Sequence, residues 1–367
     1  MDTVRNDRLL TQQEVTALAE ELDAIRESVV SDLGEVDARY IRRTVATVRW
    51  LGALGRGFLF AGFFPPAFVV GTILLGLSKI LENMEVAHNV MHGQYDWMGD
   101  ASLRGQTYEW DIAGTSDNWR KTHNLQHHTY TNVRGMDDDL GYGLLRLFPE
   151  QRWRPYYLLQ PFVAVIFAVL FEWGIAIQDL ELGRYFAGRK TGAELAHEAK
   201  PVMRKIGVQV LRDYLFFPLL AGPFFLTVLA GNAIANVMRN VWTYVVIFCG
   251  HFTAQAATFP KSVVGSESRG DWYLRQLQGS SNISGGPWLH FWTGNLSHQI
   301  EHHLYPDLPG RRYAEIAPRV REVCERYGQV YNTGSFARQF GQVVWRILRY
   351  ALPNDLWFGA RRRPAGA

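Results

Sequence analysis

The sequence predicts an all-α integral membrane protein with about four transmembrane helices and a cytoplasmic helical cap that holds a histidine-rich site for two metal ions. Three observations predict this fold. Hydrophobic residues make up 47% of the 367 residues and collect in blocks near 45–86, 156–177 and 213–250. Each block is close to the ~20 helical residues that cross a bilayer. Long polar segments separate these blocks. Eight of the eleven histidines form three clusters with helical spacing, each beside an apolar stretch.

The first 44 residues are expected to lie outside the membrane, on the cytoplasmic side. Thr11 followed by Glu14 has the pattern of a capping box and predicts a helix from there to about Val36. The charged and polar start of the chain shows no signal peptide.

Residues 45–310 are predicted to form the membrane domain. Pro65 and Pro66 divide the first apolar block, so we expect two spans that turn at the prolines. The first of them is the weaker prediction, because Arg49 and Arg56 lie in it and an arginine inside a span is costly.

Three further apolar stretches cover 156–177, 214–230 and 233–250. If all histidine clusters meet on one side of the membrane, only an even number of these stretches can cross it. The basic segment 178–212 is expected in the cytoplasm, where loops carry an excess of lysine and arginine. We therefore predict a hairpin of the last two stretches that turns at Gly231-Asn232, with 156–177 lying in the membrane but not through it.

Residues 311–367 are predicted to form cytoplasmic and interfacial helices. An amphipathic helix is expected over 311–327, and a helix with basic and tryptophan anchors over 340–352. Arg361, Arg362 and Arg363 are expected to face anionic lipid on the cytoplasmic side.

The three histidine clusters read HNVMH, HNLQHH and HQIEHH. Their members are His88, His92, His123, His127, His128, His298, His302 and His303. Neutral imidazole is the commonest metal ligand, and residues three or four apart share one helix face. So many ligands exceed one zinc site and match two metals with open positions. Ligation by nitrogen without thiolate suits iron, copper or zinc.

The boxes and their surroundings resemble the membrane fatty-acyl desaturases and their hydroxylase relatives. The resemblance rests on the spacings HxxxH, HxxxHH and HxxxHH, and on GTSDNWRKTHNLQHHTYTNVRGMDDDLGYG and DWYLRQLQGSSNISGGPWLHFWTGNLSHQIEHHLYPDLP around the second and third boxes. It covers about residues 40 to 355 and is closest to the actinobacterial, mycobacterial-type stearoyl-CoA desaturases.

The resemblance implies an oxygen-dependent acyl desaturase with two iron ions (Fe²⁺/Fe³⁺). Such an enzyme inserts a cis double bond, here expected at Δ9, into a long-chain acyl-CoA or acyl-lipid, using dioxygen and two electrons. It also implies an active site on the cytoplasmic face of a bacterial plasma membrane. A ninth ligand, His251, is implied at the end of the last span. His298 and Gln299 both lie on the ligand face before His302, and we favour His298 on ligand chemistry.

The electron donor must be a separate protein, because no HPGG haem-binding motif and no GxGxxG signature occurs in the chain. We expect a ferredoxin or a flavoprotein reductase. The net charge of +3 is too small to suggest nucleic acid.

Several alternatives stay open at this point. The same boxes fit a lipid or alkyl hydroxylase, and the glutamine of the third box fits a front-end acyl-lipid desaturase. A membrane zinc hydrolase or a non-catalytic metal-binding protein leaves most of the histidines unexplained. Asp137–Asp139 either orients ligand histidines or forms a solvated loop. Trp119, Trp288 and Trp292 line either a substrate tunnel or an aromatic belt at the membrane interface.

Overall fold

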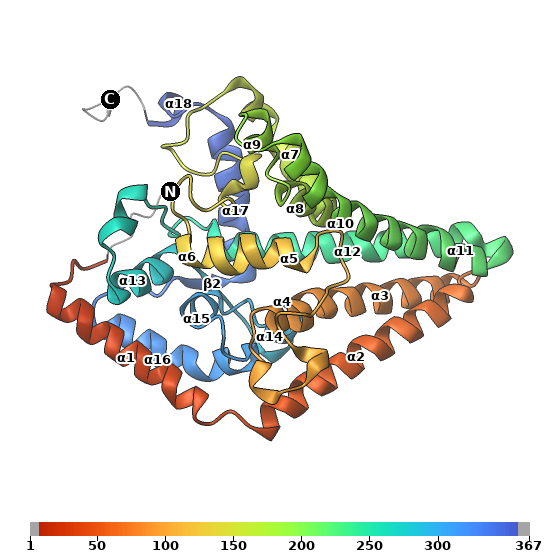
Figure 1. Cartoon of the computed structure of the whole chain (residues 1–367), viewed down its shortest axis with the longest axis horizontal. Coiled ribbons are helices and arrows are strands. Elements are labelled where there is room, and N and C mark those ends of the chain that lie inside the picture. The colour runs from red at the N-terminus through yellow and green to blue at the C-terminus, as the bar shows by residue number, and fades with distance from the viewer. Residues whose placement is uncertain (1–6, 359–367) are drawn as a thin grey trace.

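The computed structural model describes residues 7–358, which are helical apart from loops and two strands of three residues each. Two long helical hairpins form a bundle that tapers to one end, and shorter helices form a cap at the other end (Figure 1). The bundle contains α2 (Glu35–Phe60), α3 (Pro65–Leu81), α10 (Gly192–Val210), α11 (Phe217–Leu220) and α12 (Phe225–His251).

The first hairpin turns where the prolines predict it. Pro65 is the first residue of α3, a position where its fixed φ and missing N–H carry no cost. The two helices touch through glycines: a Cβ on Gly71 would lie 2.8 Å from the backbone N of Leu59 and 2.9 Å from the carbonyl O of Gly55. This close backbone contact makes α2 and α3 one rigid unit.

The second hairpin turns ten residues earlier than predicted. The chain turns at 221–224, where Gly222 has a φ of +54° and Pro223 follows it, and α12 then runs unbroken through Gly231 and Asn232. Gly231 is a packing position, since a Cβ there would collide with Leu59 of α2. The Asn232 side chain donates 2.6 Å to the backbone O of Asp213. The prediction of a turn at Gly231-Asn232 is therefore wrong, and the outgoing helix of this hairpin is 192–220, not 214–230.

Two helices of the described chain are long and apolar enough to cross a membrane: Pro65–Met91, which continues α3 through α4 (His88–Met91), and Gly222–His251. The stretch 156–177 is not one straight helix. It forms α7 (Gln160–Val169) and α8 (Phe171–Gln178), which are bent by 98° at Leu170. A bend of this size fits either a broken span or a segment that enters the membrane and returns, so the prediction that 156–177 does not cross stays a prediction.

Two buried cations of the bundle form ion pairs. Arg239 of α12 forms a buried ion pair with Glu172 of α8, and Lys79 of α3 donates 2.8 Å to Asp213. Unpaired charge in a low-dielectric interior is costly, and these pairs remove most of that cost. Arg239 therefore does not prevent α12 from being a membrane helix.

The cap is built around α1 (Gln12–Val30), which begins with the predicted Thr11–Glu14 capping box. Its apolar face packs on α13 (Arg269–Gly279) and α16 (Tyr313–Arg326). The first helix ends at Val30, earlier than predicted, and α2 begins at Glu35, so the division expected at residue 45 falls inside a helix.

Buried ion pairs join the cap to the bundle. Asp37, at the start of α2, accepts hydrogen bonds of 2.8 Å from Nε and Nη2 of Arg312, and it also pairs with Arg311. These contacts fix the position of the cap over the wide end of the bundle.

The remaining elements surround the centre of the molecule. They are α5 (Ser116–Trp119), α6 (His128–Tyr130), α9 (Leu182–Phe186), α14 (Pro287–Trp292), α15 (Gln299–Leu304), α17 (Phe336–Ala351), α18 (Asp355–Phe358), and the parallel strands β1 (Asn282–Ser284) and β2 (Thr333–Ser335). The helices predicted over 311–327 and 340–352 correspond to α16 and α17. Arg361, Arg362 and Arg363 lie outside the described residues.

Candidate metal centre

Wide helical turns present the first two histidine boxes. The helix that starts as α3 passes through a π-helical segment, Glu82–Ala87, directly before His88. A second π-helical segment, Arg120–His127, carries the second box, and the N–H of His128 donates to the carbonyl of His123. π-Turns inside helices are rare and are found mostly at functional sites. Here the second π-helical segment turns His123, His127 and His128 toward a common centre.

Eight histidines from four stretches of the chain meet between the cap and the bundle. Their ring nitrogens form three overlapping groups, in each of which the ligand atoms lie within 4.8 Å of one another. The groups are His88, His92, His123 and His302; His127, His251 and His303; and His128, His302 and His303. Seven of the eight boxed histidines are thus brought together, as predicted, and His251 joins them from the end of α12.

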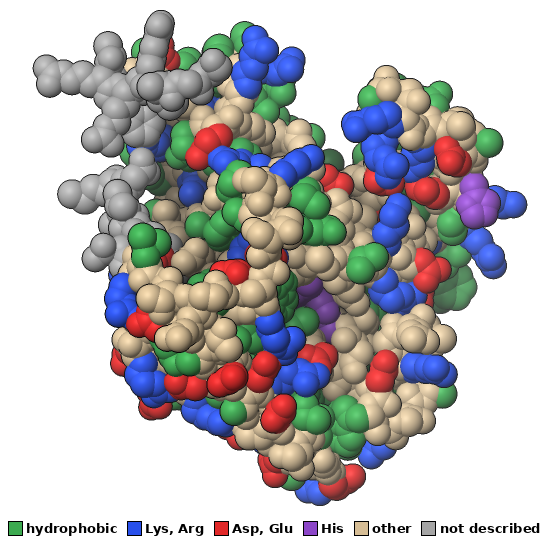
Figure 2. All heavy atoms as spheres, turned by 60° about the vertical axis from the view of Figure 1, so that its left-hand side comes forward, with side chains coloured by type: hydrophobic (Ala, Val, Ile, Leu, Met, Phe, Trp, Pro, Cys, Tyr) green, Lys and Arg blue, Asp and Glu red, His purple; other side chains and the backbone are tan. Residues whose placement is uncertain are grey.

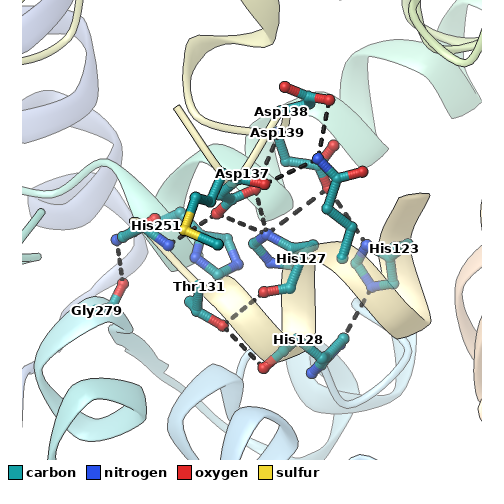
Figure 3. Close-up of polar contacts among 12 residues, drawn as sticks. His123, His127, His128, Thr131, Asp137, Asp138, Asp139, His251 and Gly279 are labelled. Atoms are coloured by element: carbon teal, nitrogen blue, oxygen red, sulfur yellow. Dashed lines mark hydrogen bonds and ion pairs between the residues drawn. The ribbon is translucent and has the colours of Figure 1, made fainter. Parts of the chain in front are cut away.

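Second partners hold several of these rings by their Nδ1 atoms. Both carboxylate oxygens of Asp137 lie 3.0 Å from Nδ1 of His127, and Oδ2 of Asp139 lies 3.4 Å from Nδ1 of His123 (Figure 3). A carboxylate that accepts the Nδ1 proton leaves Nε2 as the ligand atom. These contacts support the orienting interpretation of the acidic run for Asp137 and Asp139. Asp138 instead accepts from Gln126.

Three more rings are held by neutral groups. Asn89 lies 3.1 Å from Nδ1 of His88, Tyr313 lies 3.3 Å from Nδ1 of His302, and Gln276 lies 3.0 Å from Nδ1 of His303. None of these partners was found from the sequence. Their side chains come from α13, α16 and the neighbouring residue, and no local pattern marks an amide or a phenol as the partner of a distant histidine.

The nitrogens that face the centre fit a metal ion. Nε2 of His92 and of His302 are buried and have no hydrogen-bond partner among the described residues. Nε2 of His251 and of His303 lie 3.1 Å apart, and Nε2 of His123 and of His128 lie 3.3 Å apart. Nitrogens that bind one metal at about 2.1 Å each lie roughly 3–3.5 Å apart.

The environment keeps the imidazoles in the neutral form that binds metals. Burial lowers the pKa of His92, His123, His128 and His302 well below the usual value, and neighbouring histidines lower it further. His127 is the exception. Burial lowers its pKa, but the carboxylates of Asp137 and Asp139 outweigh that effect and raise it.

His298 does not lie in the cluster. Its ring packs on His290, with 4.4 Å between ring centroids, and it belongs to none of the groups of converging nitrogens in the described chain. Gln299 takes the inward place instead, with its side-chain amide N 2.9 Å from Nε2 of His251. The two residues are adjacent at the start of α15, where helical spacing does not decide which one faces the centre.

A mostly apolar cavity runs along the cluster. His88, His123, His127 and His251 form part of its wall, together with aromatic and aliphatic residues of α8 and α12. Trp119 also lines this cavity and stacks on His123, with 4.5 Å between the ring centroids. This supports the tunnel interpretation for Trp119. Trp288 and Trp292 line a separate apolar groove outside α3 and α12, and Trp288 is 76% exposed. Figure 2 shows a hollowed face with a histidine side chain visible inside it.

Comparison with known proteins shows which family the chain belongs to. Residues 63–335 match the family model described as fatty acid desaturase. The chain belongs to the fatty acid desaturase family. It is 49% identical, over 94% of its length, to the NADPH-dependent stearoyl-CoA 9-desaturase of Mycobacterium tuberculosis, of which 82% is covered.

The names of more distant relatives indicate that they act on other acyl groups. The desaturase is 25% identical to the sn-1 linoleoyl-lipid 6-desaturase of Synechocystis, with 79% of this chain and 82% of that protein aligned. It is 30% identical to the acyl-lipid (7-3)-desaturase of Rebecca salina, with 80% and 64% aligned. The family and the apolar helices make this chain a membrane-bound oxidoreductase that desaturates fatty acyl chains.

Proposed function

We propose that this desaturase binds two iron ions and inserts a cis Δ9 double bond into a long-chain acyl-CoA. The observation that carries the proposal is the convergence of eight buried or half-buried imidazoles beside an apolar cavity, four of which form part of its wall. The ligands would be His88, His92, His123, His127, His128, His251, His302 and His303. His298 is not among these ligands, because its ring packs against His290.

The iron centre, when bound, would supply the oxidising power that side chains lack for breaking unactivated C–H bonds. The protein residues do the rest. Asp137 and Asp139 hold His127 and His123 by their Nδ1 atoms and so aim Nε2 at the metal. The apolar wall formed by residues such as Phe171 and Ile247 would hold the alkyl chain beside the histidines and exclude water.

A second cavity supports a coenzyme A thioester as the substrate. It has a volume of about 700 Å³, and Trp110 and Ile112 line both this cavity and the apolar one. Arg204, Lys205 and Arg212 of the α10 region lie in its wall. Lys205 pairs there with Glu109 and Arg212 with Asp111, so phosphates would compete with these carboxylates. Guanidinium and ammonium groups are suited to the phosphates of coenzyme A. A thioester at Trp110 would place the head group in the second cavity and the acyl chain in the first.

The two helical hairpins would cross the membrane together, giving four spans with the metal centre on the cytoplasmic face of a bacterial plasma membrane. The tips of the hairpins meet: the rings of Phe63 and Phe224 lie 5.1 Å apart. Both tips therefore lie on one side of the membrane, at the end of the bundle away from the histidines (Figure 1).

Electrons would come from a separate ferredoxin or flavoprotein reductase. The relative from Mycobacterium tuberculosis is NADPH-dependent by name. This supports NADPH as the ultimate reductant here, delivered through such a partner.

The test is product analysis of a host that expresses the chain with a co-expressed reductase. Mass spectrometry that locates double bonds should show a new Δ9 monoene, and the purified protein should hold two irons. His127→Ala should abolish the product and lower the iron content, because it removes a ligand from the second group. His290→Gln is the matched control, since His290 lies outside the cluster, and it should keep both properties.

Other results would change the assignment. A hydroxylated chain in place of the monoene would make the protein a hydroxylase of the same superfamily. A double bond at another position in a lipid-linked chain would favour an acyl-lipid desaturase. Two zinc ions, no iron and activity without dioxygen would refute the proposal.

A further inference from the structure

A buried carboxyl group that metal binding does not explain lies in the wall of the substrate cavity. Asp179 follows the last residue of α8 and is 4% exposed. Its Oδ1 accepts a hydrogen bond of 2.9 Å from the Thr122 hydroxyl, one residue before His123. Its Oδ2 is buried and has no hydrogen-bond partner in the described structure. Asp179 and Thr122 both line the cavity, together with His123 and His127.

No lysine or arginine of the described residues forms an ion pair with Asp179. Lys121 acts on it electrostatically but donates 3.1 Å to Glu181 instead. The other charged groups that face Asp179 are the carboxylates of Asp139 and Glu181, and α10 packs against this region with the apolar Val202. The carboxyl also sits at the C-terminal end of α8, where the helix dipole disfavours negative charge.

These surroundings favour the protonated acid. Burial raises the pKa of Asp179 to about 7, and the charge on Asp139 contributes in the same direction. A buried acid with a pKa near the working pH can both give up a proton and regain one. Glu181, two residues further on, pairs with Lys121 and Arg184 at the surface, so solvent lies one side chain away.

Desaturation consumes protons, and this inference rests on the proposed function. One turnover converts R–CH₂–CH₂–R′, O₂, two electrons and two protons into R–CH=CH–R′ and two molecules of water. The substrate provides two of the four hydrogens of the two waters. The other two are protons that must come from the protein side of a cavity that otherwise excludes water.

We propose that Asp179 supplies these protons from the cavity wall. The Thr122 hydroxyl holds Oδ1, which leaves Oδ2 to carry the acidic proton. Each proton given up leaves a carboxylate that is reprotonated from solvent on the side of Glu181. Thr122 is a positioning residue in this scheme, because it fixes the orientation of the carboxyl group.

The experiment compares wild type, Asp179→Asn, Asp179→Glu and the control Asp138→Asn, all purified with iron and assayed with stearoyl-CoA, NADPH and one chosen ferredoxin and reductase pair. Asp179→Asn should lower kcat by about 10²-fold, the usual contribution of a general acid, with KM changed less than twofold. Hydrogen peroxide released per double bond should rise. Asp179→Glu should recover part of kcat, and Asp138→Asn, whose carboxyl pairs with Gln126, should behave as wild type.

The pH profile and an infrared spectrum provide independent readouts. In wild type, kcat should fall as the pH rises through about 7, because the donor loses its proton, and Asp179→Asn should lack this limb. At pH 6 the carbonyl stretch of a protonated carboxyl should be present in wild type and reduced in Asp179→Asn. This readout needs no turnover and applies also if the variant loses iron.

Unchanged kcat, unchanged coupling and an unchanged carbonyl band in Asp179→Asn would overturn the proposal while leaving the desaturase assignment intact. A wild type that binds iron but forms no monoene would overturn the assigned function and this proposal together.

Discussion

Gln299 occupies the place nearest to His251, and its amide can serve the metal there. The amide N lies 2.9 Å from Nε2 of His251, while Oε1 is buried without a partner. Turning the amide by 180° exchanges these two atoms of similar size and puts the oxygen, the atom that binds metals, beside His251. Gly250 leaves the space for this side chain, since a Cβ there would lie 2.8 Å from Cγ of Gln299.

Gln299→Ala should therefore weaken the metal centre more than His298→Ala. We expect Gln299→Ala to lower the iron content or the kcat for monoene formation by tenfold or more, the usual effect of losing a group that supports a metal. His298→Ala should keep two irons and change kcat less than threefold. Iron analysis and a product assay on the purified variants measure both. The reverse ranking would restore His298 as the ligand.

At the residue scale, the sequence predicts which histidines converge far better than it predicts the side chains that hold them. Spacing alone places His88, His123 and His302 on helix faces that converge. It does not choose between His298 and Gln299, because both satisfy a helical period at the first turn of α15. The inward choice depends on how Gly250 of α12 packs against that turn, which is a contact between distant parts of the chain.

At the scale of helices, the bundle depends on backbone contact between α2 and α3. Gly55 and Gly71 face each other, and a Cβ on Gly55 would lie 2.7 Å from the backbone N of Leu75. Small residues at such positions are how helices approach closely in membranes, where lipid provides no hydrophobic driving force between them. The contact holds the helix that carries His88 and His92 at a fixed height in the bundle.

Gly71→Ala should lower stability, because neither backbone can move away without opening the hairpin. The cost of overpacking is about 1–3 kcal/mol, and we expect a clear fall in the thermal unfolding temperature in detergent. Gly57→Ala is the matched control in α2, since nothing lies within 4 Å of its added Cβ. Alanine also has the higher helix propensity, so Gly57→Ala should be neutral or stabilising. Equal destabilisation by both variants would contradict this account.

The difference between local rules and tertiary packing explains why one hairpin was predicted correctly and the other was not. Pro65 and Pro66 end a helix by a local rule, so the sequence shows the turn. Gly231 and Asn232 have the composition of a turn but serve tertiary contacts: the glycine admits Leu59, and the asparagine bonds to the backbone of Asp213. A turn and a tight packing site use the same residues, and only the partner helix distinguishes them.

At the scale of the whole molecule, the cap covers the histidine cluster. α1 packs on α13 and α16. α15, which carries His302 and His303 of the third box, lies between α13 and α16 in the sequence. Tyr313 of α16 contacts His302, and Gln276 of α13 contacts His303. The cap therefore stabilises the histidines from the side opposite the bundle. Its existence follows from the polar sequence, whereas its position depends on long-range pairs such as Asp37 with Arg312.

The position of the hairpin tips supports the proposed orientation in the membrane. α2 has 26 residues and α12 has 27, which gives each a length of about 40 Å, more than the ~30 Å hydrocarbon core. The tips at Phe63 and Phe224 touch, so both hairpins must cross or neither does. The histidines and the cap then lie together on the other side.

Cysteine labelling can test this arrangement, because both native cysteines, Cys249 and Cys324, are buried and should give little background. Phe63→Cys and Phe224→Cys replace exposed side chains at the two tips, and Glu20→Cys lies on the exposed face of α1. In intact cells a membrane-impermeant maleimide should label both tips and should label Glu20→Cys only after permeabilisation. Labelling of one tip alone would contradict four spans. Labelling of Glu20→Cys in intact cells would place the metal centre outside, away from any cytoplasmic electron donor.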